Sequence, residues 1–389
     1  MYYVGIDISK YKHDCCILSS SINEIVAHFS FTNDLNGFNN LFKYLDSLSA
    51  NSEIKIGFEA TAHYSMNLKL ALEKAGYNFM ETNPVLISKF IKSHSLRKTK
   101  TDAIDCFSIA KWLMTVEYKP HPVKFYHTYS LKSLTRLRDS LICQRSYYLV
   151  KITNVLDHIF PEYKAFFDNR LGATAIFIIK TYNSADDVAN IPDEKYVDIH
   201  NVSRGKFTLP KFHKLKSIAK NSIGESNIYL QNQLLALINL YENMCYQIDS
   251  LDSFIGKTID ELNPKYLSIP GVGKLSAAVI YSEFGDLSKF DSPAQMLSYA
   301  GLEPSYFQSG TSAFTGRMVK HGSSHLRYTL MNLCQPLILN NSCFTKYYQK
   351  KRDEGKPYRV ACSHLIKKFL RVIFTLEKNN LSFDSSKLK

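Results

Sequence analysis

The sequence has no apolar run long enough to cross a bilayer, and Asp7 and Lys10 interrupt the apolar start that a secretory leader needs. Its eight cysteines are scattered, with no Cys-x-x-Cys pair and no histidine at zinc-finger spacing. These absences argue against a membrane-spanning chain and a zinc-finger module, and they favour reduced thiols in or near the core. We therefore expect a cytoplasmic protein with no membrane partner.

Positive charge is the main feature of the composition. Lysine and arginine number 48 against 35 acidic residues, which gives a formal net charge of +13. Hydrophobic residues make up 45% of the 389 residues, enough for two or three globular domains. A basic globular chain of this size predicts a polyanionic partner, with nucleic acid as the first candidate.

The first third of the chain predicts an α/β domain. Short β-branched runs predict strands, and apolar residues at helical spacing predict the helices between them. The expected order is three strands, then a helix, a strand, a helix, a strand and a final basic helical region that ends near Leu113. The expected strands span 2–9, 13–18, 24–31, 54–58 and 77–81, and the first two helices span 34–48 and 63–75. This is the chain order of ribonuclease-H-like folds.

The rest of the chain is predicted to be mostly helical. Residues 130–160 and 231–262 have near-heptad apolar spacing, which fits two arms of a coiled coil or helical hairpin and equally fits ordinary bundle helices. The segment 166–226 between them predicts a small helical insert. The expected domains are therefore an α/β domain at 1–125, a helical region at 126–262 and a C-terminal domain at 263–389.

A glycine-rich turn opens the C-terminal domain. The sequence Ile269-Pro270-Gly271-Val272-Gly273-Lys274, followed by an apolar helix, is typical of a helix-hairpin-helix motif. Gly271 and Gly273 would let backbone amides approach a phosphate, with Lys274 beside it. The alternative is a glycine turn that serves only packing.

Four carboxylates follow the predicted elements in an order that suggests a metal site. Asp7 lies within an apolar strand, where a charge is costly unless it is paired. Glu59 directly follows the fourth strand, and Asp102 and Asp105 share one face of a predicted helix. In a ribonuclease-H-like fold the first and fourth strands are neighbours, so the four acids can converge. Such oxygen ligands suit Mg²⁺ or Mn²⁺, which act in phosphodiester chemistry.

Two other acids lie close to this set in the sequence, and one other fold begins with the same residues. Asp14 and Glu53 are expected at the surface. The start Val4-Gly5-Ile6-Asp7 also fits the sugar-kinase and actin-like fold, but neither a second Asp-Gly phosphate motif nor a Gly-Gly adenosine motif follows.

At this point the chain resembles the DEDD-type transposases of bacterial insertion sequences, which are bridge-RNA-guided recombinases. The resemblance covers nearly the whole chain and is loose between about 166 and 226. The matching N-terminal segments are Gly5-Ile6-Asp7-Ile8-Ser9-Lys10, Phe58-Glu59-Ala60-Thr61 and Lys100-Thr101-Asp102-Ala103-Ile104-Asp105. The matching C-terminal segments are Ile269-Pro270-Gly271-Val272-Gly273, Tyr299-Ala300-Gly301-Leu302-Glu303-Pro304, Gln308-Ser309-Gly310, Lys320-His321-Gly322, Arg327 and Gly355-Lys356.

The resemblance implies a RuvC-like N-terminal domain in which Asp7, Glu59, Asp102 and Asp105 bind Mg²⁺ or Mn²⁺. It implies that Ser309 in a C-terminal transposase domain forms a covalent phosphoserine link to DNA, with the two half-sites drawn from different domains. A structured guide RNA would select donor and target DNA. The protein would form a dimer that pairs into a tetramer, in the bacterial cytoplasm and at the nucleoid when it acts.

From the residues alone, Ser305, Ser309 and Ser312 are not separable, and only the family motif selects Ser309. The motif Gln308-Ser309-Gly310 is expected in a polar loop. The basic residues that follow suit a DNA backbone, although a solvated loop is the ordinary explanation of such a cluster. This cluster comprises Arg317, Lys320, His321 and Arg327.

Three functions compete at this stage. The first is the serine-assisted recombinase, and the second is a metal-dependent junction-resolving nuclease in which Ser309 is inert. The third is a nucleic-acid-binding protein whose carboxylates hold only structural ions.

Overall fold

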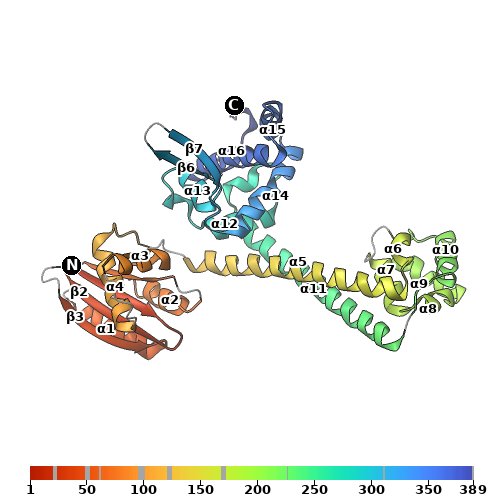
Figure 1. The fold of residues 1–389 in the computed structure, drawn as a ribbon, viewed down its shortest axis with the longest axis horizontal. Coiled ribbons are helices and arrows are strands. Elements are labelled where there is room, and N and C mark those ends of the chain that lie inside the picture. Colours follow the sequence, from red (N-terminus) through yellow and green to blue (C-terminus); the bar gives the residue numbers. More distant parts are fainter. Residues whose placement is uncertain are drawn as a thin grey trace. The chain divides into compact units, whose positions relative to one another are not determined.

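The computed structural model describes residues 1–20, 24–48, 53–60, 63–94, 101–120, 125–167, 172–225, 227–309 and 312–387. The chain divides into two compact units, Met1–His127 and Thr128–Lys389 (Figure 1). Within the described ranges, no helix combines the length and the apolarity that a membrane span requires.

The N-terminal unit is built on a five-stranded sheet with the order β3-β2-β1-β4-β5. Its strands are β1 (Tyr2–Ile8), β2 (Lys12–Ser19), β3 (Ile25–Thr32), β4 (Ile54–Glu59) and β5 (Phe79–Thr82). β1, β2 and β3 pair antiparallel, whereas β4 runs parallel to both β1 and β5. The predicted strands are confirmed within a few residues, and so is the expected contact of the first and fourth strands.

Helices cover both faces of this sheet. The helices α1 (Leu35–Ser47) and α2 (Met66–Lys74) share one core with the even-numbered side chains of β1, including Val4 and Ile6. On the other face lies α4 (Asp102–Thr115), which contacts β1, β2 and β4. The basic helical region expected up to Leu113 is two helices, because α3 (Pro84–His94) precedes α4 and packs against it. Residues 95–100 lie outside the described ranges.

The second unit contains two long helices, α5 (Phe125–Ile159) and α11 (Ile228–Leu262), each of 35 residues. The expected helical insert lies between them and is helical. It comprises α6 (Tyr163–Phe166), α7 (Ala173–Thr181), α8 (Ala185–Ala189), α9 (Tyr196–Val202) and α10 (Leu209–Lys220). Buried residues of the insert, such as Phe212, form one core with Ile152 of α5 and Ile238 of α11.

Ion pairs link α11 to its neighbours along its length. The Arg138 guanidinium on α5 donates two hydrogen bonds to Asp252, one of them from Nη2 at 3.0 Å. Lys180 of α7 lies 2.6 Å from Glu242. Large apolar side chains in the middle of both helices nevertheless remain exposed. They are Leu137, Tyr147 and Val150 on α5, and Leu240, Tyr246 and Phe254 on α11.

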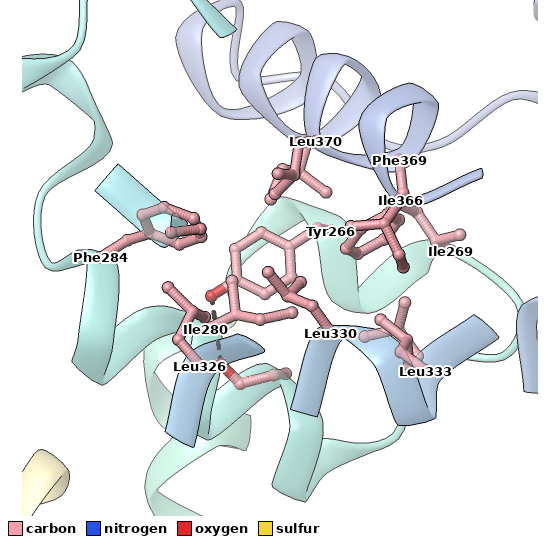
Figure 2. Close-up of a cluster of buried hydrophobic side chains, with 14 of the residues drawn as sticks. Tyr266, Ile269, Ile280, Phe284, Leu326, Leu330, Leu333, Ile366, Phe369 and Leu370 are labelled. Atoms are coloured by element: carbon pink, nitrogen blue, oxygen red, sulfur yellow. Dashed lines mark hydrogen bonds between the residues drawn. The ribbon is translucent and has the colours of Figure 1, made fainter. Parts of the chain in front are cut away.

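The C-terminal part of the second unit is a helical core with one β-hairpin. Its elements are α12 (Lys274–Phe284), α13 (Pro293–Ala300), β6 (Pro304–Ser309), β7 (Ser312–Met318), α14 (Ser324–Asn340), α15 (Ser342–Asp353) and α16 (Tyr358–Lys378). Tyr266 is the buried centre of this core, and its hydroxyl donates to the Ala277 carbonyl at 3.2 Å. Figure 2 shows its ring among Ile280, Leu330 and Leu370, contributed by three different helices.

A buried carboxylate attaches this core to α5. Glu283 is 2% exposed and accepts hydrogen bonds from Arg136, at 2.7 and 3.1 Å, while Lys132 lies 3.1 Å away. Burial alone would raise the pKa of Glu283, but the Arg136 hydrogen bonds and the two cations outweigh it and hold that pKa below its usual value. The carboxylate is therefore charged, and removing Arg136 would leave Lys132 as its one cationic partner among the described side chains.

The prediction that Gln308-Ser309-Gly310 forms a polar loop is wrong for its first two residues. They end strand β6, with Gln308 paired to Ala313 and Ser309 paired to Ser312 in an antiparallel hairpin. The strands have a physical reason, since Tyr306, Phe307 and other aromatic and β-branched residues on both sides favour extended backbone. Gly310 lies outside the described residues.

Candidate active site

Two glycines let α4 approach the sheet. A Cβ on Gly5 would lie 2.2 Å from the Cys106 carbonyl oxygen and 2.4 Å from the Ala110 nitrogen. A Cβ on Gly57, which pairs with Gly5 in the parallel register, would lie 2.7 Å from the Leu113 side chain. The atoms that Gly5 meets are helix backbone, so only glycine at position 5 permits this placement of α4. At Gly57 the Leu113 side chain would have to move.

This packing fixes which face of the sheet carries the acids. Side chains two residues apart on a strand point to the same face, so Asp7 follows Gly5 and Glu59 follows Gly57 on the face that α4 covers. Ile6 pairs with Phe58, and Asp7 and Glu59 are the next residues of these two parallel strands. Both acids are half-buried. The predicted convergence of the β1 and β4 acids is therefore supported by the register.

The other two predicted acids lie in the first turn of α4. Thr101 caps this helix, and its hydroxyl accepts a hydrogen bond from the Ile104 amide at 3.3 Å. Acidic residues are favourable there because the helix dipole is positive at its N-terminus. Lys12, at the start of β2, lies 3.9 Å from the exposed Asp102 and so places the start of α4 near the end of β1. Asp105 is half-buried.

The prediction that Asp14 lies at the surface is wrong, because this residue is 7% exposed. It pairs directly with Asp7 across β1 and β2, so both side chains point to the α4 face. Its carboxylate accepts a hydrogen bond from the Ser30 hydroxyl at 2.5 Å and lies 3.4 Å from the Lys12 ammonium. Asp14 and Cys16 are two residues apart and so lie on the same face of β2, and this spacing is the signal that the sequence contains. Glu53, by contrast, is confirmed as a surface residue.

The donor chemistry of this face fits a hard divalent cation, since carboxylate oxygens are the ligands that Mg²⁺ and Mn²⁺ prefer. Within the described ranges, however, no three His, Cys, Asp or Glu side chains are grouped closely enough to hold a metal ion. The acids share one end of one face without closing into a coordination sphere. Lys12 bridges two of them, Asp14 and Asp102.

Ser309 is the last residue of β6, and its side chain and that of Arg317 lie outside what the structure describes. The turn after β7 is described in full. Lys320 and His321 are exposed there, and Lys320 adopts a left-handed conformation with φ of 57°. Both side chains are therefore accessible to a ligand.

Arg327 has a structural role that the sequence did not reveal. Its Nη1 donates to three backbone carbonyls, those of His321 at 2.8 Å, Gly322 at 3.1 Å and Ala300 at 3.3 Å. Beside it, a Cβ on Gly301 would lie 1.9 Å from the His321 carbonyl oxygen. Arg327 thus holds the end of α13 against the base of the β6–β7 hairpin, and its predicted contact with nucleic acid has only its other nitrogens available.

The glycine-rich turn before α12 also combines one residue that packing explains with others that remain open to a ligand. Gly271 has φ of 99°, and a Cβ there would lie 2.6 Å from the Pro336 carbonyl oxygen, so its glycine is explained by packing against α14. Gly273 has no atom within 4 Å of a built Cβ and leaves its backbone open. Lys274 lies 2.6 Å from Asp260, with both side chains half-exposed. The contact of Gly271, Gly273 and Lys274 with nucleic acid stays a prediction.

Comparison with known proteins agrees with this geometry. A DEDD transposase domain of the IS110 group matches residues 4–161, which include nearly all of the sheet and all four predicted acids. A second domain, described as the transposase IS116/IS110/IS902 family, matches residues 265–349 and includes the β6–β7 hairpin. Together the two matches span more than half of the chain.

Curated relatives extend over nearly the full length. The mini-circle putative transposase for IS117 of Streptomyces coelicolor is 21% identical, with 99% of this chain and 96% of the relative covered. The pilin gene-inverting protein of Moraxella lacunata is 22% identical, covering 98% of this chain and 97% of the relative. The transposase for IS1111A of Coxiella burnetii is 30% identical over 28% of this chain and 31% of its own length.

The fold, the acids and both domain matches define an enzyme that acts on DNA, a transposase or recombinase. The chain belongs to the IS110 family of DEDD transposases.

The close approach of α4 predicts a large effect of one methyl group. Gly5→Ala forces a Cβ into the backbone of α4, so we expect the free energy of unfolding to fall by at least about 2 kcal/mol. Urea titration followed by circular dichroism measures it. The control is Gly256→Ala in α11, where the new Cβ makes an ordinary 3.7 Å contact and helix propensity stabilises by about 1 kcal/mol. Equal stability of wild type and Gly5→Ala would contradict the packing argument.

The role of Arg327 predicts a local effect on the hairpin. Arg327→Ala removes hydrogen bonds to three carbonyls, so we expect a loss of about 2–3 kcal/mol and faster amide exchange at Val319, whose N–H bonds the Glu303 carbonyl at 2.9 Å. Hydrogen–deuterium exchange measures this directly. Tyr328→Ala, which truncates the exposed neighbouring side chain, is the control. Unchanged exchange at Val319, with only DNA binding lost, would show instead that Arg327 acts as a phosphate contact.

Proposed function

We propose that this transposase cuts and rejoins DNA by a covalent phosphoserine intermediate at Ser309, with a metal ion held by Asp7, Glu59, Asp102 and Asp105. The observation that carries the proposal is the placement of Asp7 and Glu59 in register on adjacent parallel strands, on the face that α4 covers. The serine rests on the resemblance of the Gln308-Ser309-Gly310 motif, which lies within the C-terminal family match at 265–349.

Asp7 and Glu59 would hold Mg²⁺ or Mn²⁺ from the sheet, with Asp102 and Asp105 completing the site from α4. When bound, the ion supplies charge neutralisation at the phosphate and lowers the pKa of an attacking hydroxyl. Asp14 would stay outside this ligand set because the Ser30 hydroxyl and the Lys12 ammonium already engage its carboxylate. Lys12 would lose its 3.9 Å contact with Asp102 when that acid turns toward the ion.

The proposed chemistry is a transfer between two phosphoesters. The Ser309 oxygen attacks the phosphorus of the scissile phosphodiester and loses its proton to water or a base, while the deoxyribose oxygen leaves and takes up a proton. A phosphoserine ester and a free DNA hydroxyl result. Attack by the hydroxyl of another strand then releases Ser309 and rejoins the DNA, so no external energy source is needed.

Nucleic-acid contacts would surround the hairpin. The exposed Lys320 and His321, with Arg317 on β7, suit the phosphates beside the cut, as do the open backbone at Gly273 and the Lys274 side chain. A structured guide RNA would select donor and target DNA. The family resemblance and the net charge of +13 support an RNA partner in addition to DNA.

We also propose that two copies of the chain associate through the long helices, with dimers pairing on DNA into a tetramer. Leu240 and Phe254 are 41% and 57% exposed and lie two heptads apart, which places them on one face of α11. On α5, Tyr147 and Val150 are exposed and one turn apart. Apolar surface of this extent along a helix pair favours burial against a second copy. Action at the nucleoid follows if these assemblies hold DNA.

The phosphoserine proposal predicts that Ser309→Ala abolishes strand cleavage and leaves DNA binding nearly intact, since one hydroxyl is removed and no cation is lost. Asp7→Asn should abolish cleavage as well. Wild type incubated with a labelled substrate and then denatured should carry a covalent DNA adduct, which Ser309→Ala should lack. Ser305→Ala is the matched control and should cleave normally.

Mixing the two inactive chains tests how the residues combine. Partial recovery of cleavage by Ser309→Ala together with Asp7→Asn would mean that serine and carboxylates act in trans. Full cleavage by Ser309→Ala alone would overturn the covalent mechanism and leave the metal-dependent nuclease.

The self-association proposal predicts that Leu240→Gln, Tyr246→Gln and Phe254→Gln together convert the protein to a monomer in sedimentation velocity. The physical reason is the loss of Leu240 and Phe254 from the proposed contact face, together with the exposed Tyr246 between them. The control replaces three other exposed apolar residues with glutamine, namely Leu35, Val197 and Ile223. A wild type that sediments as a monomer with and without nucleic acid would refute the dimer.

A further inference from the structure

Two lysines lie over the ring of Tyr347, where α15 and α16 meet, and three more lie near them on the same helices and the turn that joins them. Lys351 and Lys368 place their ammonium groups 5.7 and 4.7 Å from the ring centroid, one from each helix. The positions 347, 350 and 351 share a face of α15, and 364, 367 and 368 share a face of α16. Lys356 lies in the turn between the helices. The α15–α16 basic face is therefore Lys350, Lys351, Lys356, Lys367 and Lys368.

The charges on this face are close enough to interact. Burial and the charge of Lys350 lower the pKa of Lys368. The pKa of His364 is lowered mainly by burial and then by the charges of Lys367, Lys351 and Lys356. The charge of Glu354 raises this pKa in part. Glu354 is the carboxylate that pairs with the face, with both oxygens 2.8 Å from the Lys351 ammonium. Asp353 also lies beside Lys350 and Glu354, so two acids against five lysines leave a net positive charge.

The core does not require this arrangement. The opposite faces of the two helices are apolar, and Phe344, Leu365 and Phe369 are fully buried in the C-terminal core. Lysines held near one another by a tyrosine ring gain only modest cation–π energy and repel one another. An anion that meets several ammonium groups at once relieves this repulsion. The partner that suits the face is thus a polyanion with regularly spaced charges.

We propose that the α15–α16 basic face binds the sugar-phosphate backbone of duplex DNA, away from the hairpin that carries Ser309. Each strand of a duplex presents one phosphate about every 3.4 Å along its axis, so a face one to two helical turns long meets several phosphates. Lysine contacts to phosphate position a protein on DNA without reading sequence. The proposal rests on the action of this family on DNA and is independent of the serine and the carboxylates, because it concerns binding rather than cleavage.

The test measures how the affinity of the full-length protein for a mixed-sequence duplex depends on salt. The variant Lys350→Gln, Lys356→Gln and Lys367→Gln removes three lysines that make no ion pair with the side chains that the structure describes. Each lost phosphate contact lowers the slope of log affinity against log salt by about 0.9, so we expect a decrease of about 2–3. The same three positions changed to arginine should keep the wild-type slope.

A second triple variant controls for the change in net charge. Lys43→Gln, Lys74→Gln and Lys164→Gln removes three exposed lysines on α1, at the end of α2 and on α6, and should leave the slope unchanged. An equal decrease in both glutamine triples would overturn the proposal, as would a loss confined to an RNA hairpin with the same number of phosphates. Ser309→Ala should keep the full slope, so failure of the phosphoserine mechanism would leave this result intact.

Discussion

The contact between the Gly5 backbone and the backbone of α4 is the constraint on which the N-terminal site depends. At that point a helix rests directly on a strand with no side chain between them. This contact holds the first turn of α4, with Asp102 and Asp105, at the end of the sheet where Asp7 and Glu59 lie. Like charges cannot be assembled by their own interactions, so rigid apolar packing must hold them together.

Much of this unit could be predicted because its signals are local. Strands, helices and the order of the acids follow from alternation, helical spacing and capping residues near them in sequence. Asp14 was misjudged because a lone acid in a strand usually faces solvent, and its burial depends on Ser30 and Lys12, which the sheet brings to it. The register of β2 against β1 determines which face of the sheet Asp14 occupies, and a shift of one residue would move its side chain to the opposite face.

The C-terminal unit was harder to predict, since its important contacts join distant segments. In the sequence, Arg327 is one more cation near a proposed nucleophile. In the structure it donates to three carbonyls from two backbone segments, the end of α13 and the turn after β7. Glu283 likewise meets Arg136 across 147 positions of sequence. Residue type alone does not distinguish a cation that stabilises the fold from one that faces solvent. Only the structure separates Arg136 from lysines such as Lys350, which are available to a ligand.

The long helices also define a length. Leu131 belongs to the C-terminal core and Ile152 to the insert core, and the 21 positions of α5 between them correspond to about 32 Å of helix, close to one turn of duplex DNA. Because α11 joins the same two cores in the opposite direction, neither helix can change length alone. One inserted residue would rotate everything beyond it by about 100°, whereas seven residues added to both helices would nearly restore the phase. Insertions and deletions in this segment are therefore expected to be tolerated only in matched steps of two helical turns.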